Sequence, residues 1–212
     1  MKRIVILISG RGSNMRALFE ANLPARIVGV ISNNAQAAGL DFARQQAVET
    51  HVVNHREFAD RTAFDKALAE RVDSFAPDII VLAGFMRILT ETFLSRFSGR
   101  VLNIHPSLLP AFPGLDTHQR ALDEGVRLHG CTVHIVTTAL DHGPIIVQAA
   151  VPVLPADDAQ RLATRVLNQE HRIYPMAVRW FLEGKITLAN GRVQFNGEPH
   201  FPDPVVSPDN VA

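Results

Sequence analysis

The chain has very little cysteine and no excess of charge of either sign. Its 212 residues contain one cysteine, Cys131, which excludes an intramolecular disulfide and is typical of a reducing compartment. Lys and Arg together number 21, as do Asp and Glu. This balance gives no support for a nucleic-acid or membrane-surface partner. Hydrophobic residues at 47% and charged residues at 20% are typical of a soluble globular protein.

Long hydrophobic runs are also absent from the sequence. The apolar run near the N-terminus spans only Ile4 to Ile8, and the segment from Gly10 to Arg16 is polar. It lacks the length and cleavage site of a signal peptide. No stretch reaches the roughly 18 apolar residues of a membrane helix. We therefore expect a cytoplasmic protein without a membrane partner. The sequence has no internal repeat or clear linker, which predicts one domain over residues 1–200 and a proline-rich tail over residues 201–212.

Short apolar runs alternate with amphipathic segments along the first half of the chain. Buried strands are expected at "RIVILI", "RIVGVIS", "THVV", "DIIVLA" and "RVLNI", and helices at residues 13–21, 37–47, 61–75 and 90–97. Continuous apolar strands separated by helices indicate an α/β fold with a mostly parallel sheet, covered by helices on both faces.

The second half follows a different pattern. "CTVHIVT" and "GPIIVQAAVPV" follow each other closely, which predicts antiparallel additions to the sheet. A long helix is expected over residues 157–183, kinked or split at Pro175, with Gly184 as its C-cap. Asn190 and Gly191 lie between two alternating runs and predict a β-hairpin.

The loop "SGRGSNM" follows the first strand and opens a helix. Gly10 and Gly12 allow a tight turn close to a ligand, and the helix N-terminus offers N–H groups to an anion. Ser13 and Asn14 add hydrogen-bonding side chains. A dinucleotide-binding loop needs a third glycine, where this chain has Met15, and an acid after the second strand, where it has "ISNNAQ". We expect a phosphate site rather than a nicotinamide site. The alternative is a glycine turn that only joins strand to helix.

Asn103, His105 and Asp141 are the candidate catalytic residues. Asn103 and His105 lie on one side of a strand at its carboxyl end, where open parallel sheets form their sites. Asp141 lies in the turn "LDHGP". A carboxylate beside an imidazole favours the charged form, and a cationic His with an amide donor suits oxyanion stabilisation. Separately, such an Asn or Asp is more often a cap or turn former. The other histidines, whose spacing does not fit a metal site, are interpreted as structural or surface residues; His118 and His142 fall in loops near the site.

Five motifs in order identify a resemblance over about residues 2–185. They are "ISGRGSN", "LAGFMRIL", "NIHPSLLPAFPG", "HIV" followed by "LDHGP", and "QEHRIYP". With these motifs the chain resembles the phosphoribosylglycinamide formyltransferases, the folate-dependent transformylases of purine synthesis. The resemblance implies a Rossmann-like fold and transfer of a formyl group from the co-substrate 10-formyltetrahydrofolate to the amine of glycinamide ribonucleotide. It implies no metal, and a monomer or homodimer.

The resemblance also implies roles for individual residues. Gly12, Ser13 and Asn14 hold the ribonucleotide phosphate, and Glu170 holds the ribose hydroxyls. Leu167 stands where relatives often have Lys or Gln, so Arg11 is a candidate substitute donor to the phosphate. His105 and Asn103 stabilise the oxyanion of a tetrahedral intermediate, and Asp141 orients His105. The implied folate-binding residues are Arg61, Phe85, Met86, Arg87, Ile88, Leu89, Thr138, Leu140 and Asp141.

Three other functions remain possible at this point. A formyltetrahydrofolate hydrolase or a methionyl-tRNA formyltransferase shares the Asn-x-His and Asp core, but neither needs the "GRGSN" loop. A nicotinamide-dependent oxidoreductase conflicts with Met15 and the missing acid. A non-catalytic nucleotide-binding module explains the loop but leaves Asn103, His105 and Asp141 without a role.

Overall fold

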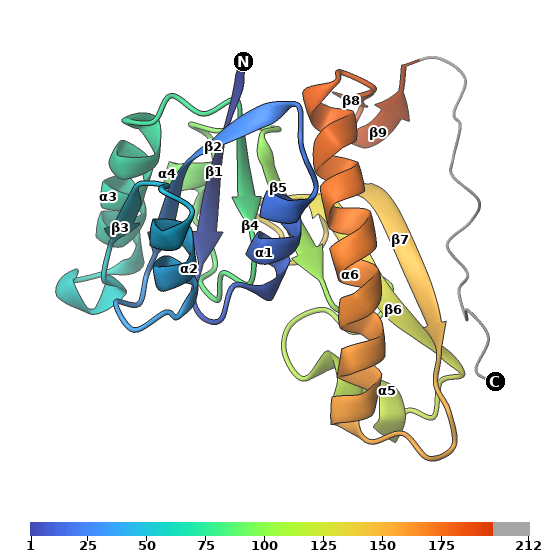
Figure 1. Ribbon diagram of the computed structural model, residues 1–212. Helices are drawn as coiled ribbons and strands as arrows, with labels where there is room; N and C mark the ends of the chain where they lie inside the picture. Colours follow the sequence, from blue (N-terminus) through green and yellow to red (C-terminus); the bar gives the residue numbers. More distant parts are fainter. Residues whose placement is uncertain (197–212) are drawn as a thin grey trace. The chain divides into compact units, whose positions relative to one another are not determined.

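A computed structural model describes residues 1–196 of the chain (Figure 1). The described chain divides into two compact units: residues 1–103 with 135–138, and residues 104–134 with 139–196. The predicted single domain over residues 1–200 stays a prediction. The predicted tail over residues 201–212 lies outside the described residues.

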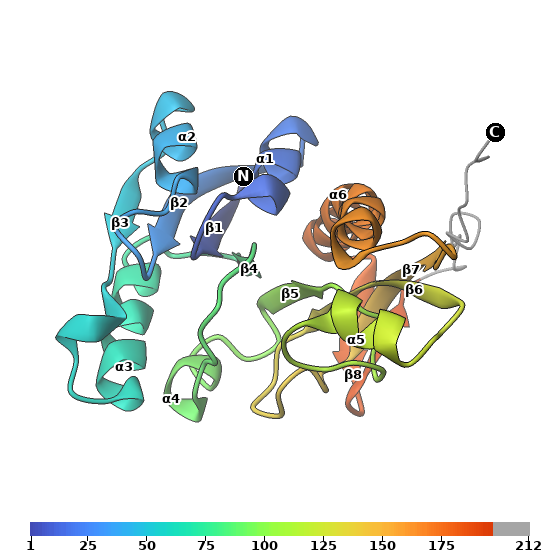
Figure 2. The ribbon, with the colours of Figure 1, turned by 90° about the horizontal axis from the view of Figure 1, so that it is seen from below.

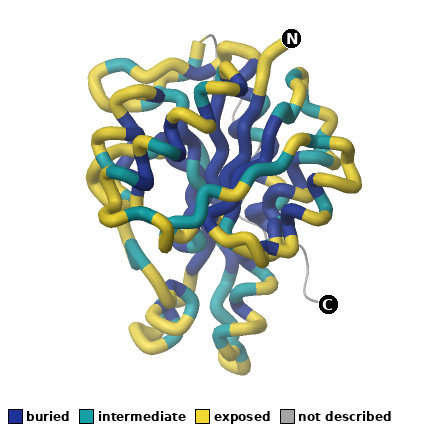
Figure 3. The backbone as a smooth tube through the Cα atoms, turned by 90° about the vertical axis from the view of Figure 1, so that its left-hand side faces the viewer, coloured by how far each residue is buried: buried dark blue, intermediate teal, exposed yellow. Residues whose placement is uncertain are grey.

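The first unit alternates strands and helices, as the sequence pattern predicts. Its elements are β1 (Lys2–Ile8), α1 (Ser13–Glu20), β2 (Ala25–Ser32), α2 (Gly39–Gln45), β3 (Thr50–Val52), a 3₁₀ turn η1 (His55–Glu57), α3 (Arg61–Asp73), β4 (Ile79–Leu82) and α4 (Glu91–Leu94). Figure 2 shows α1 and α2 on one side of β1, β2 and β4, and α3 and α4 on the other. β4 and the carboxyl-terminal halves of β1 and β2 are buried (Figure 3).

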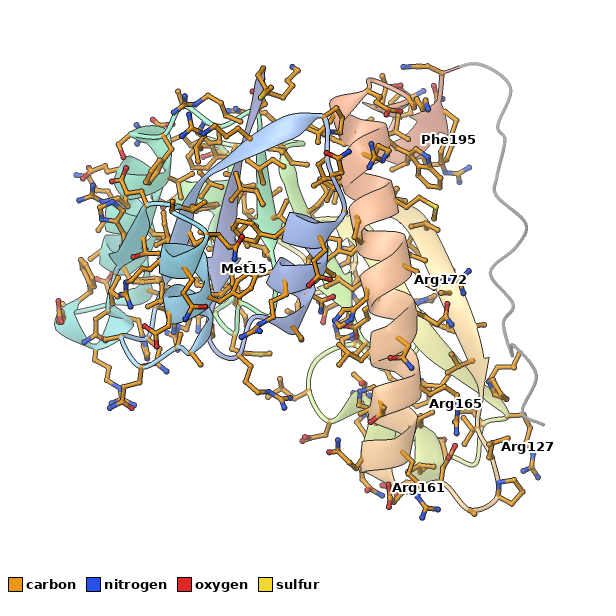
Figure 4. All side chains as sticks on the ribbon, in the orientation of Figure 1. Met15, Arg127, Arg161, Arg165, Arg172 and Phe195 are labelled. Carbon is orange, nitrogen blue, oxygen red and sulfur yellow. The ribbon has the colours of Figure 1, made fainter. Side chains whose placement is uncertain are left out.

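The second unit combines an antiparallel strand pair with a long helix. β5 (Val101–His105) begins in the first unit and ends in the second, and is followed by α5 (Thr117–Asp123), β6 (Leu128–Ile135), β7 (Ile145–Pro152), α6 (Ala159–Leu182), β8 (Ile186–Ala189) and β9 (Arg192–Phe195). α6 packs along β7 (Figure 1). In Figure 4, Arg165 on α6 is labelled; its guanidinium makes two hydrogen bonds to Asp157, at 2.6 and 2.9 Å.

Seven strands form the main sheet in the order β3-β2-β1-β4-β5-β6-β7. The pairs β1–β2, β1–β4, β2–β3 and β4–β5 are parallel, and β6–β7 is antiparallel. The predicted mostly parallel α/β fold with antiparallel additions in the C-terminal half is confirmed. Among residues 1–196, no helix combines the length and apolar character needed to cross a membrane.

The structure decides one detail that the sequence left open and adds one element. α6 is one continuous helix with Pro175 inside it, so it is not split there. Pro175 and its neighbours Tyr174 and Ala177 are buried, so tertiary packing offsets the loss of one helical hydrogen bond. The short helix α5 was not predicted, because its seven residues show too little periodicity. The hairpin is confirmed: Asn190 and Gly191 have φ of 51° and 70°, as its turn requires.

Gly130 is the position in the second unit where a side chain fits worst. A Cβ there would overlap the Ala149 carbonyl oxygen on β7 and lie 2.9 Å from Leu108 Cδ2. We expect Gly130→Ala to lower the free energy of unfolding by about 1–3 kcal/mol, the usual cost of overpacking. Denaturant unfolding measures the change. Gly10→Ala is the control, because its methyl would meet open space; equal stability of the two variants would contradict the packing.

Candidate active site

The loop between β1 and α1 is built around a glycine that no other residue can easily replace. Gly12 is the N-cap of α1 with φ of 76°, a left-handed conformation that favours glycine. A Cβ on Gly12 would lie 2.9 Å from Met15 Cε and 3.2 Å from Gly39 Cα. Among the described residues no side chain caps α1, so its first N–H groups remain available to an anion.

Met15 stands at the position where a dinucleotide-binding loop needs its third glycine. Its side chain is fully buried, on α1 (Figure 4). It occupies the space beside Gly12 and Gly39, where a dinucleotide fingerprint needs a third glycine for close helix packing. The Gly39 N–H also donates to the Gly10 carbonyl, at 3.1 Å. The loop is therefore fixed from both sides by packing and by a backbone hydrogen bond.

The segment from Gly84 to Leu89 follows β4 and alternates between core and surface. Phe85 and Leu89 are buried in the hydrophobic core of the first unit. Met86 and Ile88 point outward, with 69% and 45% of their surfaces exposed. Met86 and Ile88 therefore leave apolar surface open to a ligand, and the folate role of Phe85 to Leu89 stays a prediction.

His105 and Asp141 form a buried pair in the second unit. His105 Nδ1 lies 3.5 Å from Asp141 Oδ2, and the two side chains are 7% and 9% exposed. On its other side, His105 Nε2 lies 3.0 Å from the Phe112 carbonyl oxygen. Oxygen acceptors therefore face both ring nitrogens, an arrangement that fixes the plane of the imidazole. The structure brings these two predicted catalytic residues together.

A strained turn determines the position of Asp141. Its φ of 52° lies in the left-handed region, which Asp tolerates better than most residues. The Gly114 N–H donates to Asp141 Oδ2 at 2.8 Å. His134 Nε2 lies 4.0 Å from Asp141 Oδ1 and its side chain is 2% exposed. Sequence reasoning interpreted His134 as structural or surface, because nothing in its spacing links it to Asp141.

The loop after His105 is anchored to β6 and β7 by polar side chains. The Thr132 hydroxyl donates to the Ser107 carbonyl at 2.6 Å and accepts from the Leu109 N–H at 3.0 Å. Gln148 Nε2 donates to the Leu109 carbonyl at 2.8 Å. The Ser107 hydroxyl donates to the Ala111 carbonyl at 2.6 Å. These bonds hold the carbonyl of Phe112 against His105.

A second histidine pair lies behind this loop. His118 Nδ1 is 3.2 Å from His129 Nε2, and the Phe112 ring packs edge-on against His129. Burial lowers the pKa of His129 to about 4, with a further lowering by His118 and His105 and a partial offset by the Pro106 carbonyl. Burial, followed by the charge of His105, also lowers the pKa of His118. We expect both rings to be neutral at pH 7.

The remaining predicted residues are distributed over both units. In the first unit Asn103 is half-buried on β5, Arg11 and Arg61 are exposed, and Thr138 is exposed. In the second unit Glu170 is buried on α6. Leu140 lines a cavity of about 430 Å³ with Pro113, Gly114, Ala139 and His142. Within residues 1–196, no three His, Cys, Asp or Glu side chains are grouped as metal ligands.

The sequence matches the formyl transferase family over residues 2–178. The chain belongs to this family. The predicted resemblance and the predicted class of enzyme, a formyltransferase, are confirmed. The sequence is 47% identical over 199 residues to the phosphoribosylglycinamide formyltransferase of Escherichia coli (strain K12), covering 92% of this chain and 94% of that protein. It is 46% identical over 196 residues to the trifunctional purine biosynthetic protein adenosine-3 of Bos taurus, covering 90% of this chain and 19% of that protein.

Solved structures of this formyl transferase family have the same fold. Glycinamide ribonucleotide transformylase 1 from Symbiobacterium toebii superposes with a TM-score of 0.89 at 48% identity, covering 92% of this chain and 94% of that chain. The phosphoribosylglycinamide formyltransferase of Coxiella burnetii, in complex with CHES, also has a TM-score of 0.89, at 47% identity and the same coverage.

The lowered pKa of His129 makes the folded protein less stable in mild acid. An unfolded histidine binds its proton below about pH 6.5, whereas folded His129 does so only near pH 4. Since the unfolded state binds more protons between these values, the free energy of unfolding falls as pH falls from 6.5 to 4. We expect His129→Gln to make this fall shallower, by up to about 1.4 kcal/mol per pH unit. Chemical denaturation at several pH values tests this; parallel curves for parent and variant would contradict it.

Proposed function

We propose that the protein transfers the formyl group of 10-formyltetrahydrofolate to the amine of glycinamide ribonucleotide. The observation that carries this proposal is the buried His105–Asp141 pair, in a chain 47% identical to a phosphoribosylglycinamide formyltransferase over 92% of its length. In this reaction the amine nitrogen bonds to the formyl carbon, and the bond between that carbon and the folate nitrogen then breaks. A proton passes from the attacking amine to the departing nitrogen.

Asn103, His105 and Asp141 are the proposed catalytic residues. The formyl oxygen becomes an oxyanion in the tetrahedral intermediate, and the Asn103 amide and the His105 imidazolium donate hydrogen bonds to it. Their spacing on β5 points both side chains to the same side of the strand. Asp141 Oδ2, held by the Gly114 N–H, orients the ring and balances its charge. It also relays the proton through water.

The phosphate loop is the proposed site for the ribonucleotide phosphate. Gly12, Ser13 and Asn14 present the uncapped N-terminus of α1, whose partial positive charge favours an anion. Arg11 is exposed and supplies a charged donor, replacing the donor that Leu167 does not provide. Glu170 on α6 is the proposed partner of the ribose hydroxyls.

Two segments form the proposed folate subsite. Phe85 to Leu89 supply one wall with the exposed side chains of Met86 and Ile88. Thr138, Leu140 and Asp141 supply the loop that precedes β7. Arg61 and Arg87 meet the glutamate tail of the folate. We further propose a cytoplasmic location, since a relative is a purine biosynthetic protein, and a monomer or homodimer.

A formyl-transfer assay tests the function. The protein is mixed with 10-formyltetrahydrofolate, with and without glycinamide ribonucleotide, and tetrahydrofolate release is followed by absorbance. We expect release only with the ribonucleotide, and a loss of about a hundredfold to a thousandfold in kcat for His105→Ala. His51→Ala on β3 is the matched control and should keep the parent rate. Release without the ribonucleotide would identify a hydrolase, and no release at all would indicate a non-catalytic binding module.

Arg11 provides a separate test of the phosphate site. Removing one charged donor weakens binding of the phosphate, so Arg11→Ala should raise the KM for glycinamide ribonucleotide about threefold to tenfold and leave kcat nearly unchanged. Arg71→Ala, an exposed arginine near the end of α3, is the control. An unchanged KM for Arg11→Ala would remove Arg11 from the phosphate site.

A further inference from the structure

Ser9 connects two loops that the proposed function assigns to different substrates. It is the first residue of the phosphate loop "SGRGSNM". Its hydroxyl accepts a hydrogen bond from the Met86 N–H at 2.8 Å, and its own N–H donates to the Gly84 carbonyl at 3.1 Å. Met86 belongs to the proposed folate wall, Phe85 to Leu89, and Gly84 directly precedes it. One residue at the start of the phosphate loop therefore holds the backbone at the beginning of that wall.

Asn33 determines the direction of the Ser9 hydroxyl. The hydroxyl donates its hydrogen to Asn33 Oδ1 at 2.6 Å. Its oxygen lone pairs are therefore available to accept the hydrogen bond from the Met86 N–H. Asn33 is 6% exposed. His55 Nδ1 lies 3.2 Å from Nδ2 of the Asn33 side chain and 3.1 Å from the Asn33 backbone carbonyl oxygen. A buried amide with partners on both sides has little freedom to rotate.

This arrangement gives a function to a departure noted in the sequence. Asn33 follows β2, in the region where a dinucleotide-binding fold carries an acid that contacts the ribose. Here the side chain is buried and bonds to Ser9 instead. The end of β2 thus contributes to the support of the phosphate loop rather than to a ribose contact of that kind.

The far end of the folate wall has an independent anchor. The Thr90 N–H donates to Asp65 Oδ2 at 2.5 Å, and Asp65 is fully buried on α3. Between the two anchors, Phe85 and Leu89 are fixed in the core. The end at Met86 is held instead by Ser9, a residue of the phosphate loop region.

We propose that Ser9, oriented by Asn33, is a positioning residue that ties the folate wall to the phosphate loop. This inference rests on the proposed function. Loss of the Ser9 hydroxyl releases the Met86 N–H and lets the wall move while α1 and its N-terminal loop keep their packing. A change beside the phosphate loop therefore weakens the binding of the folate, a molecule that the phosphate loop does not touch.

Ser9→Ala is the direct test. We expect it to raise the KM for 10-formyltetrahydrofolate about threefold to tenfold, the effect of one or two lost hydrogen bonds, with a smaller change in kcat. Ser74→Ala is the matched control: it removes a serine hydroxyl bonded to the Arg71 carbonyl at the end of α3, away from both loops. Ser9→Thr keeps the hydroxyl and should restore a KM close to that of the parent.

Asn33→Ala and the double variant with Ser9→Ala provide a second test. Both substitutions remove the same hydrogen bond. The folate KM of the double variant should therefore exceed the higher of the two single-variant KM values by no more than about twofold. Fully multiplicative effects, or an unchanged folate KM in Ser9→Ala, would overturn the proposal. If Ser9→Ala does not fold, the folate KM of Asn33→Ala decides in the same way.

Amide hydrogen exchange separates this inference from the proposed function. The Met86 amide of Ser9→Ala should exchange faster than that of the parent, whereas amides of α3 should not change. This measurement needs no substrate. If the parent releases no tetrahydrofolate with the ribonucleotide, the proposed function fails while the exchange result still tests the link. Unchanged exchange at Met86 would show that the link does not exist.

Discussion

The buried carboxylate of Asp141 is the interaction on which the second unit's site depends. A carboxylate removed from water is costly unless hydrogen bonds and opposite charge compensate it. Here the Gly114 N–H donates a hydrogen bond to it, and the imidazoles of His105 and His134 lie 3.5 and 4.0 Å from its oxygens. The left-handed backbone of Asp141 has a cost of its own, which these partners offset. The turn, the loop containing Gly114 and the end of β5 are therefore held in one arrangement.

The first unit differs, because its proposed phosphate site consists of backbone N–H groups at the start of α1 rather than of a charged side chain. Gly12 exposes the start of α1, while Met15 and Gly39 leave the loop no room to shift. The segment after β4 uses buried Phe85 and Leu89 as fixed points, so that Met86 and Ile88 can face outward. In both loops, core packing determines the conformation. The N–H groups at the start of α1 and the side chains of Met86 and Ile88 do not take part in that packing and are available to a ligand.

Much of this arrangement could be predicted from local pattern. The strand and helix order, the β6–β7 pair and the Asn190–Gly191 turn each have a signal within a few residues. The pairing of His105 with Asp141 followed from the rule that sites form at the carboxyl ends of strands. Whether α6 continues through Pro175 could not be decided from the sequence, because this depends on the packing of α6 against β7. His134 was missed because no sequence pattern links it to the turn that carries Asp141. The Ser9–Asn33 bond was missed because its two residues are 24 positions apart.

Cys131 has a practical consequence for work on this protein. It is fully buried on β6, and burial, with the nearby charge of Glu170, raises the pKa of its thiol well above the usual range. Since the thiolate is the reactive form, the native chain resists alkylating reagents in its folded state. A cysteine introduced at an exposed position is then labelled selectively, without first removing the natural one. A fluorophore or spin label at one chosen point on the phosphate loop or on the segment after β4 can then report on ligand binding, without a signal from label attached to Cys131.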